Sequence, residues 1–263
     1  MRITQKTLQR MCNAGEKIAA LTCYDASFAS LLENSGVEIL LVGDSLGNVL
    51  QGERTTLSVT IDDMIYHTKC VAQGSTKAFI MADMPFGTSQ VSPQKTFENA
   101  VELISAGANM VKIEGGSVMA DTVRFLSQRG IPVCSHIGLM PQSLNILGGY
   151  KVQGKSISHA NQLFEDAVLM EEAGAGMLLM EAIPASLSKR ITKKLIIPTI
   201  GIGAGVDCDA QVLVLYDMLG IYSGKKSRFI KNYMSGASSI NQAVENYVKE
   251  VKSKNFPKLE HGF

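Results

Sequence analysis

The amino-acid sequence predicts an α/β fold, specifically a closed (β/α)8 TIM barrel. Eight short apolar segments alternate with amphipathic ones, and ionisable side chains stand at the ends of most of them. Near-continuous apolar runs are typical of parallel strands that are buried on both faces. The 263 residues are close to the length of about 250 that is usual for such a barrel. An open, doubly wound sheet is the structural alternative.

The eight apolar runs are the predicted strands of the barrel. They are Ile18–Asp25, Glu38–Asp44, Ala78–Met84, Met110–Glu114, Val133–Ile137, Gly176–Glu181, Pro198–Gly203 and Val212–Tyr216. No internal repeat, low-complexity tract or linker separates them. We therefore expect residues 1–263 to form a single barrel domain that ends in C-terminal helices.

Helical patterns fall between most of these strands. Ser92 and Pro93 have the residue types of an N-cap and a first helical position, and Ser35-Gly36 is typical of a helix C-terminus. The segment 204–211 is too short for a full helix. The predicted helices are Ala26–Asn34, Ile61–Gln73, one from Pro93 to near Gly107, Val118–Gln128, Ala160–Ala173, and one or two within Asn232–Lys254.

Composition excludes several classes of protein. A net charge of +1 without a clustered basic face does not indicate nucleic-acid binding. No run approaches the length of a membrane span, and the polar N-terminus does not resemble a signal peptide. Five scattered cysteines without a C-x-x-C pair favour free thiols and a cytoplasmic location. The low charged content of 19%, with 24 glycines and 13 methionines, favours a homo-oligomer.

Three carboxylates end neighbouring predicted strands. Asp44, Asp83 and Glu114 close the second, third and fourth runs. The C-terminal ends of barrel strands meet at one rim, where active sites of this fold lie, so the three groups should face one space. A divalent cation would cancel their repulsion, and an all-oxygen ligand set suits Mg2+ rather than Zn2+. The alternative is that these carboxylates cap helices or pair with Lys or Arg.

Three further strand ends carry groups suited to catalysis. Lys112 faces the same side of its strand as Glu114 and could hold a substrate carboxylate, form a Schiff base or neutralise the carboxylates. His136 could hydrogen-bond a substrate oxygen or be a satisfied core residue. Glu181 follows an apolar run that should raise its pKa, so it is the candidate proton acceptor. Its structural alternative is an ion pair with Lys189 or Arg190.

Two other features at this rim are less specific. The glycines of Gly201–Gly205 could cradle a phosphate through backbone N–H groups, or could only permit a tight turn. Tyr24 and Asp25 reach the rim without an identified partner.

Several of these segments, in order, resemble the ketopantoate hydroxymethyltransferase family. The similarity runs from about Ile18 to the C-terminal helices. The segments that carry it are Val42–Gly47, Met81–Phe86, Ala106–Gly116, His136–Leu139, Pro141-Gln142, Gly148–Gly154 and Ile200–Gly205.

The resemblance implies a barrel of the phosphoenolpyruvate mutase/isocitrate lyase type. It implies transfer of a hydroxymethyl group from 5,10-methylenetetrahydrofolate to 3-methyl-2-oxobutanoate, giving 2-dehydropantoate and tetrahydrofolate for pantothenate and coenzyme A synthesis. It also implies a cytoplasmic oligomer, commonly a decamer. The implied roles are Mg2+ at Asp44, Asp83 and Glu114, substrate contacts from Asp44, Ser45, Asp83, Lys112 and His136, and proton abstraction by Glu181.

The sequence departs from the family pattern at Ser135, Met140, Ala210 and Tyr216, none of which has an assigned chemical role. Two other functions remain open at this stage. One is a metal-dependent lyase or phosphonomutase acting on a small 2-oxo acid. Relatives with those activities often use a cysteine on a mobile loop, whereas Cys134 here lies within a predicted strand. The other is a non-catalytic barrel that binds a metabolite, which would need no proton acceptor.

Overall fold

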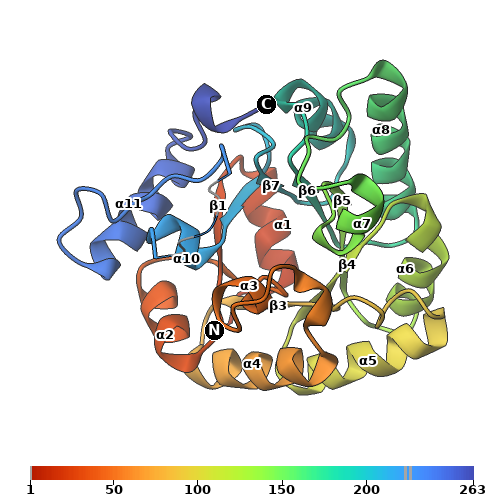
Figure 1. The fold of residues 1–263 in the computed structure, drawn as a ribbon, viewed down its shortest axis with the longest axis horizontal. Helices are drawn as coiled ribbons and strands as arrows, with labels where there is room; N and C mark the ends of the chain where they lie inside the picture. Colours follow the sequence, from red (N-terminus) through yellow and green to blue (C-terminus); the bar gives the residue numbers. More distant parts are fainter. Residues whose placement is uncertain (1, 222–223, 225–226) are drawn as a thin grey trace.

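The computed structural model describes residues 2–221, 224 and 227–263. Eight parallel strands close into a barrel in chain order, with β8 hydrogen-bonded to β1 (Figure 1). The predicted (β/α)8 barrel is confirmed. The strands are β1 (Ile18–Thr22), β2 (Ile39–Val42), β3 (Phe79–Asp83), β4 (Met110–Glu114), β5 (Val133–Gly138), β6 (Met177–Glu181), β7 (Thr199–Ile202) and β8 (Ala210–Leu213).

Helices surround the strands (Figure 1). The longer ones are α1 (Gln5–Asn13), α2 (Ala26–Asn34), α4 (Ile61–Gly74), α5 (Pro93–Ser105), α6 (Ala120–Ser127), α8 (Ile157–Glu172), α9 (Ala185–Lys194) and α11 (Ile240–Lys252). Short helices α3 (Leu46–Val49), α7 (Leu144–Leu147) and α10 (Leu215–Met218) lie in the connections, with 3-10 turns η1 (Thr56–Ser58), η2 (Ser117–Met119), η3 (Pro141–Ser143) and η4 (Leu259–His261). No helix in the described ranges is both long and apolar enough to span a membrane.

Capping residues set several helix boundaries where the sequence predicted them. The hydroxyl of Ser92 accepts a hydrogen bond from the backbone N–H of Lys95, and Pro93 begins α5. The Asp25 carboxylate accepts from the N–H of Phe28 and begins α2, so Asp25 has a structural partner at the rim. These bonds satisfy N–H groups that a helix leaves unpaired in its first turn.

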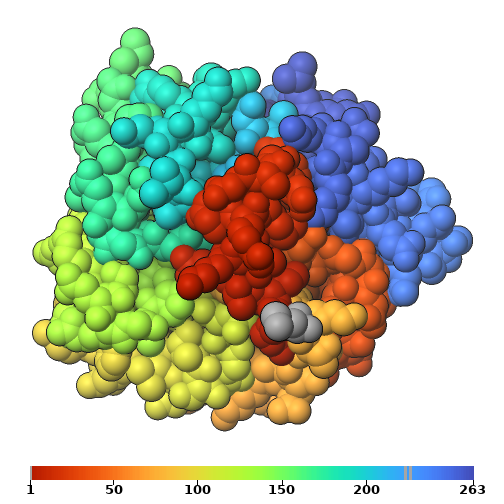
Figure 2. All heavy atoms as spheres, turned by 180° about the vertical axis from the view of Figure 1, so that it is seen from behind, coloured from red at the N-terminus to blue at the C-terminus, as the bar shows by residue number. Residues whose placement is uncertain are grey.

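Helix α1 was not predicted, and it covers the N-terminal end of the barrel. Figure 2 shows the N-terminal segment crossing the centre of this face. Leu8 is fully buried, while the amide of Gln9 donates to the carbonyl of Ile196 just before β7. The backbone N–H of Ile3 donates to Lys77, which precedes β3. Because α1 covers this end, the opposite end is the one that remains for a site.

Two other predictions were misplaced. The eighth strand starts at Ala210 rather than Val212, because Asp209 binds the backbone and hydroxyl of Thr199 and so fixes β8 against β7. The apolar residues that follow begin α10 instead of extending the strand. In the tail, α11 begins only at Ile240, after its N-cap Ser239, and the eight preceding residues from Asn232 are not helical.

The ends of β5 and β6 approach each other closely at Gly138. Gly138 has a φ of +95°, and a Cβ there would lie 2.3 Å from the carbonyl oxygen of Glu181. We expect Gly138→Ala to lower the free energy of unfolding by about 3 kcal/mol or more, combining backbone strain with overpacking. Denaturant unfolding followed by circular dichroism measures this change.

Gly130→Ala is the matched control for that substitution. Gly130 has a φ of +82° but no atom within 4 Å of the added Cβ. Gly130→Ala should therefore lower the free energy of unfolding only through backbone strain, by about 1 kcal/mol. Equal losses in the two variants would contradict the close approach at Gly138.

Candidate active site

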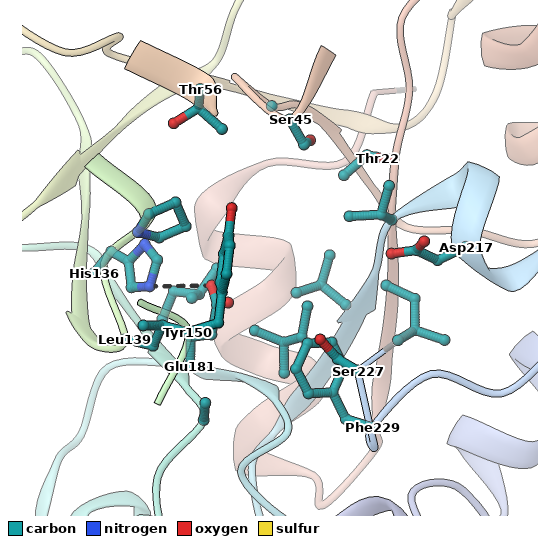
Figure 3. A pocket seen from close by; sticks show the side chains of 18 of the residues that line it. Thr22, Ser45, Thr56, His136, Leu139, Tyr150, Glu181, Asp217, Ser227 and Phe229 are labelled. Atoms are coloured by element: carbon teal, nitrogen blue, oxygen red, sulfur yellow. Dashed lines mark ion pairs between the residues drawn. The ribbon is translucent and has the colours of Figure 1, made fainter. Parts of the chain in front are cut away.

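A cavity of about 670 Å³ opens at the C-terminal ends of the strands. Every side chain predicted from the sequence to belong to the site lines it: Asp44, Ser45, Asp83, Lys112, Glu114, His136 and Glu181. Figure 3 shows Ser45, His136 and Glu181 facing the cavity, Ser45 from the connection after β2 and the other two from β5 and β6. The strand ends thus bring these groups together as the barrel fold predicts.

Asp44 and Asp83 are joined through the backbone. One carboxylate oxygen of Asp83 accepts a hydrogen bond from the N–H of Asp44 at 3.0 Å, and both residues are buried. Gly43 makes room for Ser45, because a Cβ there would lie 2.8 Å from the Ser45 hydroxyl, whereas at 3.6 Å it would be in ordinary contact with that same Asp83 oxygen. The end of β2 therefore orients the carboxylate at the end of β3.

Asp83 and Glu114 each accept a backbone hydrogen bond through one of their two carboxylate oxygens. Oδ2 of Asp83 takes the Asp44 N–H, and Oε2 of Glu114 takes the backbone N–H of Gln142 at 3.0 Å. Oδ1 of Asp83 and Oε1 of Glu114 are buried and accept no hydrogen bond within the described residues. Such buried acceptors are costly unless a positive group faces them.

Lys112 supplies one positive charge among these carboxylates. Its Nζ lies 3.2 Å from Oδ1 of Asp83 and 3.1 Å from Nδ1 of His136. Burial alone would lower the pKa of Lys112, but Asp83, Glu114 and Asp44 outweigh it and hold that pKa above its ordinary value. The ammonium therefore stays charged. This contact corresponds to the prediction that Lys112 neutralises carboxylates.

His136 is neutral, and its tautomer follows from its neighbour. Burial, followed by the charge of Lys112, holds the pKa of His136 well below its usual value. An ammonium only donates, so Nδ1 accepts and the ring proton is on Nε2. Nε2 lies 3.5 Å from Oε2 of Glu181, the contact that is dashed in Figure 3. His136 thus presents an N–H to the cavity beside a carboxyl group.

Glu181 ends β6 facing His136 rather than a lysine or arginine of α9. Lys189 contacts Asp207 and Arg190 contacts Asn161, so neither forms the ion pair that was the structural alternative. Burial raises the pKa of Glu181 to about 8. The next residue, Ala182, has a φ of +46°, an uncommon value for a residue with a side chain.

The other carboxylates also resist ionisation. Burial, then the charge of Asp83, raises the pKa of Asp44 to about 7. Burial raises the pKa of Glu114 well above its ordinary value. A divalent cation would reverse this tendency by stabilising the ionised forms. The donor set of carboxylate oxygens fits a hard cation such as Mg2+, since Oε1 of Glu114 accepts no hydrogen bond among the described residues and Oδ1 of Asp83 faces only the Lys112 ammonium.

Within the described ranges, no three His, Cys, Asp or Glu side chains are already arranged as ligands around one point. Mg2+ ordinarily takes only one or two carboxylates and keeps several waters. The residues are therefore compatible with a Mg2+ site that substrate and water complete.

Ser45 has a partner that sequence reasoning did not identify. The hydroxyls of Tyr24 and Ser45 lie 2.9 Å apart, and the Tyr24 ring packs edge-on against Tyr216 with 5.9 Å between centroids. Tyr216, one of the departures from the family pattern, thus supports a residue that holds Ser45. Ser135 and Ala210 are buried within β5 and β8.

Other lining residues come from loops and were not predicted. Asn48, Arg54, Tyr150 and Asp217 line the cavity, and Tyr150 projects into it (Figure 3). None of these four residues ends a strand, and a position at the end of a strand was the sequence pattern that predicted the other site residues. The glycines after β7 serve close packing, since a Cβ at Gly203 would lie 2.6 Å from the ring of Phe229.

The raised pKa of Glu181 predicts a pH-dependent stability difference. An unfolded Glu has an ordinary pKa of 4.5, whereas burial raises the pKa of the folded group to about 8. Between these values the native state binds the extra proton, so the contribution of Glu181 to stability falls as pH rises from about 4.5 to 8. Glu181→Gln, which cannot ionise, should gain melting temperature relative to the wild type across that range.

Calorimetry of the metal-free proteins at pH 5, 7 and 9 measures this difference. Glu165→Gln is the control, because Glu165 is exposed on α8 and does not line the cavity. A difference in melting temperature between Glu181→Gln and the wild type that stays constant with pH would contradict a proton held on Glu181.

Comparison with solved structures shows the same barrel. Phosphoenolpyruvate phosphomutase from Streptomyces platensis has a TM-score of 0.63 at 12% identity over 83% of each chain. The PEP mutase/isocitrate lyase superfamily member 2,3-dimethylmalate lyase has 0.60 at 17% identity over 84% of each chain. Phosphonopyruvate hydrolase complexed with oxalate and Mg2+ has 0.61 at 12% identity, over 94% of this chain and 96% of the other. These likenesses show the fold alone.

Sequence comparison gives a closer relationship. The 3-methyl-2-oxobutanoate hydroxymethyltransferase of Nitrosospira multiformis is 71% identical over 263 residues, all of both chains. Its counterpart in Nitrosomonas europaea is 65% identical over 262 residues, covering 100% of this chain and 97% of the relative. Residues 2–259 match the family described as ketopantoate hydroxymethyltransferase. The chain therefore belongs to the ketopantoate hydroxymethyltransferase family.

Proposed function

We propose that the protein transfers a hydroxymethyl group from 5,10-methylenetetrahydrofolate to 3-methyl-2-oxobutanoate, giving 2-dehydropantoate and tetrahydrofolate in pantothenate synthesis. The observation that carries this proposal is one cavity that combines buried carboxylates, a charged lysine and a strongly basic glutamate. It occurs in a chain that is 71% identical, over its full length, to a protein of that name.

The cation is proposed to be Mg2+, held by Asp44 and Asp83 with Glu114 at the same site. Oε1 of Glu114, which accepts no hydrogen bond among the described residues, supports this assignment, as does Oδ1 of Asp83, whose contact there is the ion pair with Lys112. So does the related barrel of phosphonopyruvate hydrolase, which was solved with Mg2+ and oxalate, a small dicarboxylate. When bound, the cation would supply Lewis acidity that stabilises negative charge on the oxygens of the oxo acid.

The oxo acid is proposed to lie between the carboxylates and Glu181. Its own carboxylate would approach Lys112 and the Ser45 hydroxyl, which Tyr24 orients. The N–H at Nε2 of His136 would donate to a substrate oxygen. Glu181, across the cavity, would take the C3 proton as a general base. The resulting carbon nucleophile would form its new bond to the methylene carbon of the folate, and both bonds from that carbon to the folate nitrogens would break. The oxygen of one water would become the hydroxyl of the product, and one proton from this water and the proton taken by Glu181 would go to the two folate nitrogens, giving tetrahydrofolate.

The remaining expectations are part of the same proposal. Five free cysteines support a reducing, cytoplasmic environment. Exposed apolar side chains such as Val118, Ile146 and Ile157 support self-association, with the decamer taken from the family resemblance. The alternative activity, a lyase or phosphonomutase on a 2-oxo acid, shares the fold but would not require folate.

Reconstitution tests the proposed reaction directly. Purified protein with Mg2+, 3-methyl-2-oxobutanoate and 5,10-methylenetetrahydrofolate should form 2-dehydropantoate, detected by mass spectrometry. Omitting the folate or chelating the metal with EDTA should abolish it, and added Mg2+ should restore it. Full activity in EDTA would refute the metal, whereas folate-independent breakdown of the oxo acid would favour the lyase.

Proton exchange isolates the role of Glu181. With Mg2+ and deuterated solvent but no folate, the wild type should exchange the C3 proton of the oxo acid, followed by NMR. Glu181→Gln should exchange about 100-fold or more slowly, the usual contribution of a general base. Glu165→Gln should match the wild type. Wild-type exchange in Glu181→Gln would assign the base to another residue.

A further inference from the structure

Gln142 is uncharged, but it hydrogen-bonds to residues at the C-terminal ends of β2, β3 and β4. It lies in the η3 turn after β5 and is 5% exposed. Its side-chain Nε2 donates to Oδ2 of Asp44 and to the carbonyl of Met84, both at 2.9 Å. Its backbone N–H donates to Oε2 of Glu114 at 3.0 Å. One residue therefore contacts carboxylates from two different strand ends.

The orientation of this amide is determined by its neighbours. The carboxylate of Asp44 and the carbonyl of Met84 face the same end of the amide, and an NH2 group has two hydrogens to give. The opposite end accepts a hydrogen bond from Nε2 of Gln90 at 3.2 Å. A reversed amide would place its oxygen against two acceptors.

Gln90 in turn is anchored to the backbone of the loop after β3. Its Oε1 accepts from the N–H groups of Gly87 at 2.9 Å and Ser89 at 3.3 Å. A continuous series of hydrogen bonds thus runs from this loop through Gln90 and Gln142 to Asp44. Hydrogen bonds in series polarise and strengthen one another in a buried setting.

We propose that Gln142 is a positioning residue for cation binding, which sets the orientations of Asp44 and Glu114 together. Its two N–H contacts hold Oδ2 of Asp44 and Oε2 of Glu114. Oε1 of Glu114 is thereby left without a hydrogen-bond donor among the described residues. This inference rests on the proposed function in requiring that these carboxylates bind a divalent cation.

A neutral amide suits this position better than a charged donor. A lysine or arginine there would add a second positive charge beside Lys112 and would compete with the cation. An amide satisfies one oxygen of a carboxylate while leaving its negative charge for the metal. Groups that orient metal ligands in this way typically contribute 10- to 100-fold to metal affinity.

Gln142→Met tests the proposal, because methionine keeps the length and the backbone N–H but removes the amide. Gln211→Met is the matched control, since Gln211 is 2% exposed and its amide donates to the carbonyl of Gly205, outside the cavity lining. The dissociation constant of Mn2+, used as a spectroscopic probe for Mg2+, is measured by electron paramagnetic resonance without substrate. Melting temperatures are recorded in parallel.

Gln142→Met should raise the Mn2+ dissociation constant about 10-fold or more. Gln211→Met should lower the melting temperature to a similar extent and leave that constant within about twofold. Gln90→Ala, an exposed change that leaves Gln142 in place, should raise it about 2- to 10-fold, as expected for one lost hydrogen bond. This variant keeps the test informative if Gln142→Met does not fold.

Two outcomes would overturn the proposal. One is unchanged Mn2+ affinity in both Gln142→Met and Gln90→Ala, and the other is a loss of Mn2+ affinity in Gln211→Met as large as that in Gln142→Met. Absence of Mn2+ binding by the wild type is a different result. It would refute the metal site of the proposed function itself, so the two failures are distinguishable.

Discussion

The constraint on which the site depends is the burial of several carboxylates around a single ammonium. Asp44, Asp83 and Glu114 are each no more than 6% exposed, and Lys112 is 4% exposed among them. In a low-dielectric interior, like charges at this range cannot all ionise without compensation. The observed compensation is one lysine, together with N–H donors that hold one oxygen of each carboxylate. The remaining negative charge is what a divalent cation would bind.

The closed parallel barrel makes this arrangement possible. Parallel strands place all their C-terminal ends at one rim, so residues far apart in the chain share one cavity. α1 covers the other rim, and its buried Leu8 belongs to the core. Fine positions then depend on close backbone approaches. Gly43 leaves room for the Ser45 hydroxyl, and Gly138 lets the end of β5 reach β6 beside Glu181.

The strands and the charged site residues could be predicted because each strand is an apolar run and most of these runs have an ionisable side chain at their end. The bounds of β4, Met110–Glu114, were predicted without error. Gln142 could not be assigned a role in this way, because it is uncharged and lies in a loop after its strand. Helix α1 gave little signal, since Leu8 is its one buried side chain. The predicted start of β8 was wrong because the hydrogen bond that the Thr199 hydroxyl donates to the Asp209 carboxylate is a tertiary contact that no local pattern reveals.

Burial has two opposing effects on Glu181. It makes the carboxylate a stronger base, with a pKa of about 8, but it also keeps the group protonated at neutral pH. A base that already holds a proton cannot take another from carbon. In the proposed reaction, a divalent cation at the carboxylates would favour ionisation of Glu181 through its positive charge. The neutral His136 adds no such charge, but its N–H at Nε2 can stabilise the ionised form from 3.5 Å. Glu181 would then be both a strong base and ionised only when the cation is bound. Deprotonation of the substrate would therefore require a completed cation site.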